Sequence, residues 1–162
     1  MLALALFGGL VASWAIGEAA LTAIDRPTPG TLALPTGIVL LVSQVAGVVE
    51  HLARGTAHCL LGGSVLAAGI ALRLWAIATL GTGFATALAP SRIVRTGPYR
   101  WMAHPSEIGL VAAVGGTAIL LASQAAALAL AVLIGLVAVR CRREDVQLRA
   151  CRGAPDPTGP MA

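Results

Sequence analysis

The chain has 162 residues, of which 57% are hydrophobic and only 11% are charged, and its mean hydropathy is +0.86. Charged residues make up about a quarter of an ordinary soluble domain, so this composition excludes that class and predicts an integral membrane protein. The net charge of +4 comes from arginine. Because a basic face of a bilayer protein reports topology and attraction to anionic lipid, we expect membrane lipids and no nucleic acid as partners.

Five apolar segments approach the length of roughly 20 residues that a spanning helix needs. They are Leu2–Ile24, Leu34–Val49, Cys59–Leu80, Ser106–Ala122 and Ala125–Val139. Only Ser123 and Gln124 separate the last two segments, which predicts a tight helical hairpin. The expected fold class is therefore all-α, a membrane bundle of about five transmembrane helices.

The residues after Val139 read RCRREDVQLRA and keep the helical spacing while replacing apolar residues with charge. This pattern predicts that the fifth helix continues into the cytoplasm. We expect one transmembrane domain over residues 1–153, with the first two spans in 1–57. The proline- and glycine-rich residues 154–162 are expected to form a flexible tail.

The arginine distribution orients the predicted bundle. With the amino terminus outside, all arginines except Arg54 and Arg73 fall on the cytoplasmic side, as the positive-inside rule requires. The first segment has no basic region before it and is long enough to span, so it is interpreted as a retained helix. We therefore expect the site to face the cytoplasm, and we expect the membrane to be a prokaryotic inner membrane.

The segment TGPYRWMAHPSE, residues 96–107, places polar and aromatic residues directly before an apolar helix. Pro105 suits the first helical turn, where its missing N–H costs nothing, and this puts His104 near the N-cap. The open N–H groups at that helix start favour an anionic group. The loop Val94–Arg100 is accordingly interpreted as a ligand-binding loop.

Three charged residues fall within or at the edge of predicted spans. An unpaired charge in a bilayer is costly, so each is a functional candidate by default. For Arg73, beside Trp75, we favour a functional role. The alternative is that its side chain extends along the helix to keep its charge at the membrane surface. For Glu107, a structural explanation by the helix dipole and a functional role are about equally favoured. For Glu18 we favour a structural partner or an interfacial location.

Metal-binding and disulfide patterns are not evident. The histidines His51, His58 and His104 are scattered, and the three cysteines have no paired spacing. We therefore expect no metal and no disulfide framework.

The order of LRLWA, IVRTGPYRWMAHP, a glycine, a short helical hairpin and REDVQL resembles the isoprenylcysteine carboxyl methyltransferase and phospholipid methyltransferase group. The resemblance covers roughly Gly69–Gly153 and makes residues 58–153 the family-like catalytic core. The matching positions are Ile93, Val94, Gly97, Pro98, Tyr99, Arg100, His104, Pro105, Gly109, Glu144, Asp145, Leu148 and Gly153.

The resemblance implies an enzyme that binds S-adenosylmethionine on the cytoplasmic side and takes a lipophilic methyl acceptor from the bilayer. Methyl transfer from a sulfonium is an in-line displacement, so positioning and exclusion of water can supply much of the acceleration. The residues assigned to catalysis are Arg100, His104 and Glu107, the first two mainly for positioning. The residues assigned to the cofactor are Val94, Gly97, Pro98, Tyr99, His104, Pro105, Glu144 and Asp145, and those assigned to the acceptor are Arg73, Trp75 and Glu107.

The chain departs from the family pattern at several positions. Ala103 stands where the family has arginine, Glu107 where it has tyrosine, Asp145 where it has a second glutamate, and Arg152 where it has an aromatic residue. These changes argue against a prenylcysteine substrate and leave a carboxylate, phenol, thiol or amine acceptor open, as well as loss of activity.

Two other classes of function remain open at this point. One is an NADPH-dependent oxidoreductase resembling membrane sterol reductases. The other is a non-enzymatic scaffold in which small residues permit close helix packing, namely Gly62, Gly63, Gly69, Gly115 and Gly116.

Overall fold

The computed structural model describes residues 2–22, 33–80 and 96–153, and for some residues at helix ends it describes the backbone alone. The elements within these ranges are all helices, which confirms the expected all-α bundle. They are α1 (Leu2–Thr22), α2 (Ala33–Arg54), α3 (Cys59–Leu80), the short 3-10 helix η2 (Gly97–Arg100), α4 (Pro105–Leu120) and α5 (Gln124–Gly153). The predicted tail lies outside the described residues.

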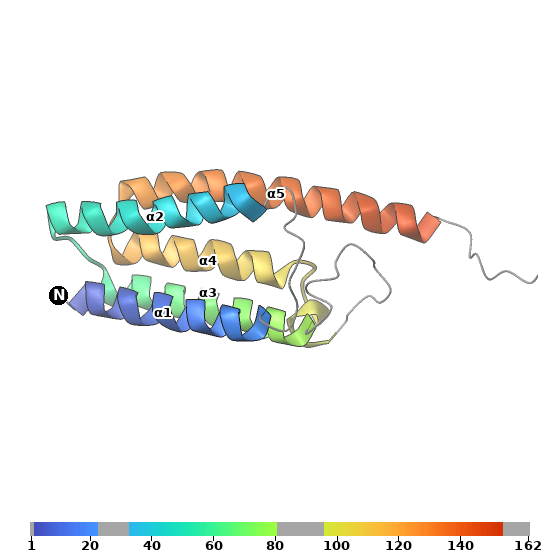
Figure 1. Ribbon diagram of the computed structural model, residues 1–162, viewed down its shortest axis with the longest axis horizontal. Coiled ribbons are helices and arrows are strands. Elements are labelled where there is room, and N and C mark those ends of the chain that lie inside the picture. Colours follow the sequence, from blue (N-terminus) through green and yellow to red (C-terminus); the bar gives the residue numbers. More distant parts are fainter. Residues whose placement is uncertain (1, 23–32, 81–95, 154–162) are drawn as a thin grey trace, which may run out of the picture.

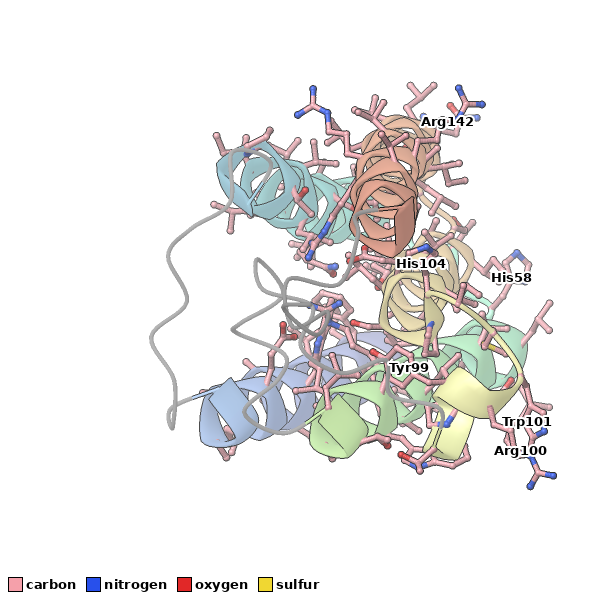
Figure 2. All side chains as sticks on the ribbon, turned by 90° about the vertical axis from the view of Figure 1, so that its right-hand side faces the viewer. His58, Tyr99, Arg100, Trp101, His104 and Arg142 are labelled. Atoms are coloured by element: carbon pink, nitrogen blue, oxygen red, sulfur yellow. The ribbon has the colours of Figure 1, made fainter. Side chains whose placement is uncertain are left out.

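The five α-helices run up and down, side by side, as Figure 1 shows. The view along the bundle in Figure 2 places α4 between α3 and α5, with α1 beside α3 and α2 beside α5. The start of α4 and the end of α5 lie at the same end of the bundle, where α5 extends beyond the other helices (Figure 1). The two segments that carry the matched motifs therefore share one end of the molecule.

Four of the helices, α1, α2, α3 and α5, are long and apolar enough to cross a membrane, whereas α4 is shorter. The chain is an integral membrane protein. With 16 residues, α4 is roughly 24 Å long, less than the hydrocarbon thickness of roughly 30 Å. The 30 residues of α5 span roughly 45 Å, so the prediction that the fifth helix continues through RCRREDVQLRA as one long helix is confirmed.

The starts of α2, α4 and α5 each lie one residue before the predicted ones, and the carboxyl ends of α2 and α4 differ by more. α2 continues to Arg54 instead of ending at Val49, because Glu50 and His51 at its end have local partners. α4 ends at Leu120, since the chain turns through Ala122, whose φ is +48°. The predicted hairpin between α4 and α5 is thereby confirmed.

The turn of this hairpin is held by hydrogen bonds. The Ser123 hydroxyl accepts the Ala126 N–H at 3.0 Å and so caps α5. The same hydroxyl donates to Glu50 on α2 at 2.6 Å, and that carboxylate also accepts the Ala125 N–H at 3.0 Å. These contacts attach α2 to the start of α5 at the end of the bundle opposite the matched motifs.

The closest packing lies between α3 and α4. A Cβ added at Gly69 would overlap the backbone of Ala113, and one added at Gly116 would overlap the backbone of Leu66. Gly62 contacts α4 in the same way, whereas a Cβ at Gly63 would meet open space and one at Gly115 would make only ordinary contact. Glycine thus allows the two backbones to approach as small residues do in membrane bundles.

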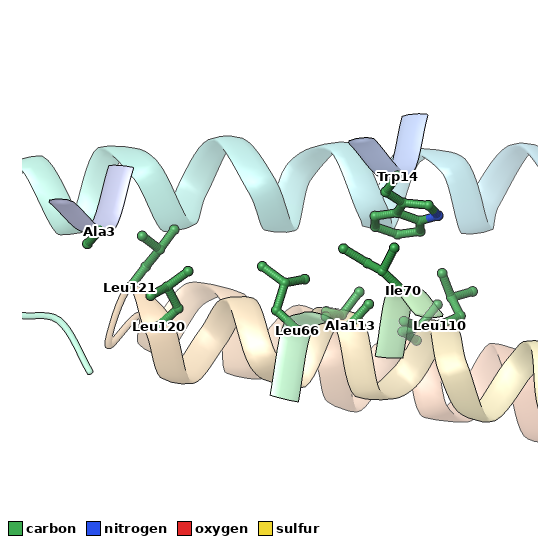
Figure 3. Packing of buried hydrophobic residues seen from close by; sticks show 10 residues of the cluster. Ala3, Trp14, Leu66, Ile70, Leu110, Ala113, Leu120 and Leu121 are labelled. Atoms are coloured by element: carbon green, nitrogen blue, oxygen red, sulfur yellow. The ribbon is translucent and has the colours of Figure 1, made fainter. Parts of the chain in front are cut away.

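The buried apolar cluster surrounds this contact. Figure 3 shows Leu66 and Ile70 of α3 beside Leu110 and Ala113 of α4, with Trp14 of α1 over them. This cluster fixes the position of α4 against α1 and α3 and the rotation of α4 about its own axis. The first turn of α4, where His104 and Glu107 lie, is consequently held against a rigid support.

Candidate functional site

The segment before α4 folds as a compact turn against the end of α3. Gly97 has φ +55°, a conformation that favours glycine, and a Cβ there would approach Thr79 Oγ1 to 2.7 Å. Pro98 is buried, and its carbonyl accepts the N–H groups of Trp101 and Met102, each at 3.2 Å. Gly97 thus supplies the backbone conformation and the close approach to α3 that this turn needs, and the Pro98 carbonyl closes it.

The helix start is as the sequence predicts. His104 occupies the N-cap with φ −128° and ψ 60°, Pro105 follows in the first turn, and the His104 carbonyl accepts the Ile108 N–H at 3.1 Å. Figure 2 shows His104 between α4 and α5. The positive end of the α4 dipole lies at this position.

A groove of about 610 Å³ runs between α4 and α5. Its walls come from Ala103, His104, Glu107, Ile108, Val111, Ala112, Ile134, Val137, Ala138 and Cys141. Because α4 and α5 are antiparallel, the start of α4 lies opposite Cys141, while Val111 lies opposite the earlier turns of α5. The groove therefore has His104 and Glu107 at one end, but its surface is almost entirely apolar.

Glu107 is the charged residue of the groove wall. It is only 7% exposed, and its Oε1 lies 3.1 Å from Nη1 of Arg140 on α5. The other oxygen, Oε2, is buried and has no hydrogen-bond partner among the described residues. Burying a polar atom without a hydrogen-bond partner costs free energy, so the burial of Oε2 is unfavourable.

Arg73 lies at the junction of α1, α3 and α4 and is not part of the groove wall. Its Nη2 and Nε donate to the two oxygens of Glu18 at 2.6 and 3.1 Å, and Trp14 Nε1 donates to the same carboxylate at 2.6 Å. Arg73 Nη1 also donates to the Ser106 hydroxyl at 3.1 Å. The expectation of a structural partner for Glu18 is confirmed, and the observed contacts of Arg73 hold the first turn of α4.

Other predicted residues lie around the groove or away from it. Trp75 and Trp101 make an edge contact with ring centroids 6.2 Å apart, and both are exposed. Arg100 is exposed and points away from the bundle, whereas Tyr99 lies closer to α3 and α4 (Figure 2). The structure thus brings His104 and Glu107 together in the groove and leaves Trp75 and Arg100 outside its wall.

The remaining predicted cofactor residues are only partly described. The backbone of Glu144 and Asp145 continues α5 one turn beyond Cys141, but their side chains lie outside the described residues, as does Val94. Within the described part of the chain, no three His, Cys, Asp or Glu residues gather into a group that could hold a metal ion.

Sequence reasoning did not find Arg140 and Cys141 or the apolar wall of α5. The signal was present in the spacing of Ile134, Val137, Ala138 and Cys141, which places them on one face of a helix. To predict that this face turns toward α4, one must know how α5 is rotated about its own axis. The hairpin connection alone does not determine that rotation.

The comparison with known protein families agrees with this geometry. A family model described as the isoprenylcysteine carboxyl methyltransferase family matches residues 61–150, which include most of α3, the GPYR turn, α4 and most of α5. No curated protein and no solved structure matches the chain. The match covers more than half of the chain and contains the whole groove, so this membrane protein belongs to the isoprenylcysteine carboxyl methyltransferase family and is a membrane methyltransferase.

Proposed function

We propose that the protein transfers a methyl group from S-adenosylmethionine to a lipophilic acceptor that enters the groove from the bilayer. The observation that carries this proposal is the apolar groove between α4 and α5, which has His104 and Glu107 at one end and lies within the segment that matches the family. A lipophilic acceptor fits such a groove with its reactive end beside His104 and Glu107. From the arginine distribution we place this end of the groove at the cytoplasmic surface, and we propose that the membrane is a prokaryotic inner membrane.

The residues at the His104 end of the groove suit the cofactor. Its carboxylate finds positive potential at the start of α4, where His104 and Pro105 lie. Its ammonium and ribose hydroxyls need acceptors, which Glu144 and Asp145 on the extension of α5 would provide. Gly97, Pro98 and Tyr99 form the adjoining turn, where Tyr99 offers an aromatic surface for the adenine.

The acceptor half of the groove is open to lipid. Ile108 and Ile134 line the groove and remain exposed, so an acceptor can enter laterally without crossing water. The surrounding aliphatic side chains contact its hydrophobic part, and because the acceptor comes from lipid and not from water, this contact selects by packing and not by hydrophobic transfer energy. We therefore assign substrate selection to this half of the groove.

The chemistry requires positioning more than covalent participation by the protein. S-adenosylmethionine, when bound, supplies a methyl group on a positively charged sulfur. The first turn of α4, held by Arg73 and by the buried cluster, orients the acceptor atom, while the apolar walls exclude water. His104 serves as a positioning residue at the junction of the two halves.

Calorimetry of the purified protein with S-adenosylmethionine, S-adenosylhomocysteine and NADPH tests this assignment. We expect binding of the first two and none of NADPH. His104→Ala and Glu144→Ala should each weaken S-adenosylmethionine binding roughly tenfold to more than a hundredfold, because a hydrogen bond to a charged group contributes about 1.5–3 kcal/mol. Asp145→Ala should have a smaller effect.

The matched control is Ser64→Ala, which removes an exposed hydroxyl that bonds only within α3. It should leave cofactor affinity unchanged. Wild-type affinity in both His104→Ala and Glu144→Ala, in protein that remains monodisperse in detergent, would refute the proposed cofactor site. Binding of NADPH in place of S-adenosylmethionine would reassign the protein to the reductase class.

A further inference from the structure

The outer face of the GPYR turn carries an aromatic and basic surface that is not part of the groove. Trp75 of α3 and Trp101 meet edge to face with ring centroids 6.2 Å apart, and they are 48% and 69% exposed. Arg100 is exposed and has no hydrogen-bond or ion-pair partner among the residues that the structure describes. Figure 2 shows Arg100 and Trp101 pointing away from the bundle on the same side. We call these three residues the turn surface.

The depth of the turn surface in the membrane follows from its place along α3. Trp75 lies roughly 24 Å along this spanning helix from its start at Cys59. A helix that enters a hydrocarbon core of roughly 30 Å at Cys59 brings Trp75 to within about 6 Å of the opposite boundary. Gly97 packs against Thr79, one helical turn beyond Trp75, so the GPYR turn lies on the aqueous side of this tryptophan. The turn surface therefore lies where hydrocarbon meets the lipid headgroups.

The three side chains suit that boundary. A tryptophan ring is apolar but carries one N–H donor, and tryptophan is enriched at both surfaces of a bilayer for this reason. A guanidinium presents several N–H donors in a plane and binds phosphate oxygens through two of them. The turn surface thus offers apolar area at the level of the upper acyl chain and a phosphate-binding cation beyond it.

We propose that the turn surface binds an anionic phospholipid, with the lipid phosphate on Arg100 and the upper part of an acyl chain against Trp75 and Trp101. An anionic lipid is favoured over a zwitterionic one, because the latter carries a cation that opposes the guanidinium. The inference is independent of the proposed methyl transfer and assigns Arg100 to the membrane surface instead of catalysis. The bound lipid holds the GPYR turn at a fixed depth beside the start of α4.

The test measures quenching of tryptophan fluorescence by brominated lipids. The full-length protein is placed in phosphatidylcholine bilayers that contain phosphatidylglycerol or phosphatidylcholine brominated near the headgroup end of one acyl chain. Trp14 is 8% exposed, so quenching reports mainly on the two exposed tryptophans. The same titration with Trp101→Phe gives the part of the signal that comes from Trp101.

The expected result is a preference for phosphatidylglycerol over phosphatidylcholine at the turn surface. Arg100→Gln should lower this preference roughly fivefold, which is the effect of one arginine near an anionic surface, whereas Arg100→Lys should keep most of it. The matched control is Arg142→Gln, which removes an exposed arginine from α5, away from Trp101 (Figure 2). It removes the same charge and should leave the preference unchanged.

The other outcomes overturn the inference in distinguishable ways. Equal affinity for the two lipids in wild-type protein, or a preference that Arg100→Gln does not change, would show that Arg100 binds no anionic lipid. Weak quenching by both lipids would show that a partner protein or a second copy of the chain covers the tryptophans. Loss of S-adenosylmethionine binding in Arg100→Gln with the lipid preference retained would assign Arg100 to the cofactor. Wild-type protein that binds no S-adenosylmethionine would overturn the proposed function, while a lipid preference that depends on Arg100 would still support this inference.

Discussion

Removing the carboxylate of Glu18 should destabilise the bundle strongly, because it leaves the Arg73 guanidinium without its counter-charge. The Arg73 side chain is 11% exposed and that of Glu18 is 29% exposed, and two hydrogen bonds of 2.6 and 3.1 Å join them. Breaking a buried ion pair by removing one partner costs about 3–5 kcal/mol. Arg73 retains the Ser106 hydroxyl as a partner, so we expect about 3 kcal/mol for Glu18→Gln.

Removing both charges should cost much less. A buried ion pair replaced by neutral residues of similar volume often gives a protein of similar stability. Glu18→Gln combined with Arg73→Met should therefore unfold within about 1 kcal/mol of the wild type. The two single changes are then non-additive, as expected for residues in direct contact.

The assay is unfolding in mixed micelles by titration with sodium dodecyl sulfate, followed by the helical circular dichroism signal. Ser64→Ala is the control and should lie within about 0.5 kcal/mol of the wild type, as for other surface changes. A Glu18→Gln variant as stable as this control would refute the reasoning. So would a double variant that is less stable than either single one.

Three further predictions concern packing, capping and topology. Gly116→Ala should destabilise by about 1–3 kcal/mol through overlap with α3, whereas the matched Gly63→Ala, which meets open space, should be neutral or stabilising in the same unfolding assay. Ser123→Ala should lower stability by about 0.5–2 kcal/mol, because α5 loses its N-cap; an unchanged midpoint would show that the α2 carboxylate caps α5 alone. In a variant without native cysteines, single cysteines replacing Arg100 and Arg142 should react with an impermeant thiol reagent from the same, cytoplasmic side of the membrane, and labelling from opposite sides would contradict the topology.

Much of the architecture is readable from the residue order. The low charge content requires a bilayer, and the apolar segments are long enough to predict the helices that cross it. Pro105 sets a helix start because its missing N–H is tolerated there, and Ser123 and Gln124 leave room for little more than a turn. The motif from Gly97 to Pro105 likewise indicates the family, although its turn also packs against Thr79 of α3.

The pairing of charges was decided by the tertiary structure. Arg73 was a candidate for the substrate site, yet its partner is Glu18, 55 residues earlier in the chain. Arg140 was considered only as one of several cytoplasmic arginines, yet it pairs with Glu107. Several arginines could have paired with each carboxylate. The sequence therefore identified the charged residues but not which arginine pairs with which carboxylate.

The physical reason lies in the rotation of membrane helices. A helix at a water interface shows its orientation by one apolar face, but α1, α3, α4 and α5 are apolar around most of their circumference, because both lipid and protein interior accept apolar side chains. Composition therefore determined that these segments are helices in a membrane. The close contacts of Gly69 and Gly116 with the facing backbones determined the rotation of α3 and α4 about their own axes. The rotation of α4 in turn determined which of its side chains face the groove.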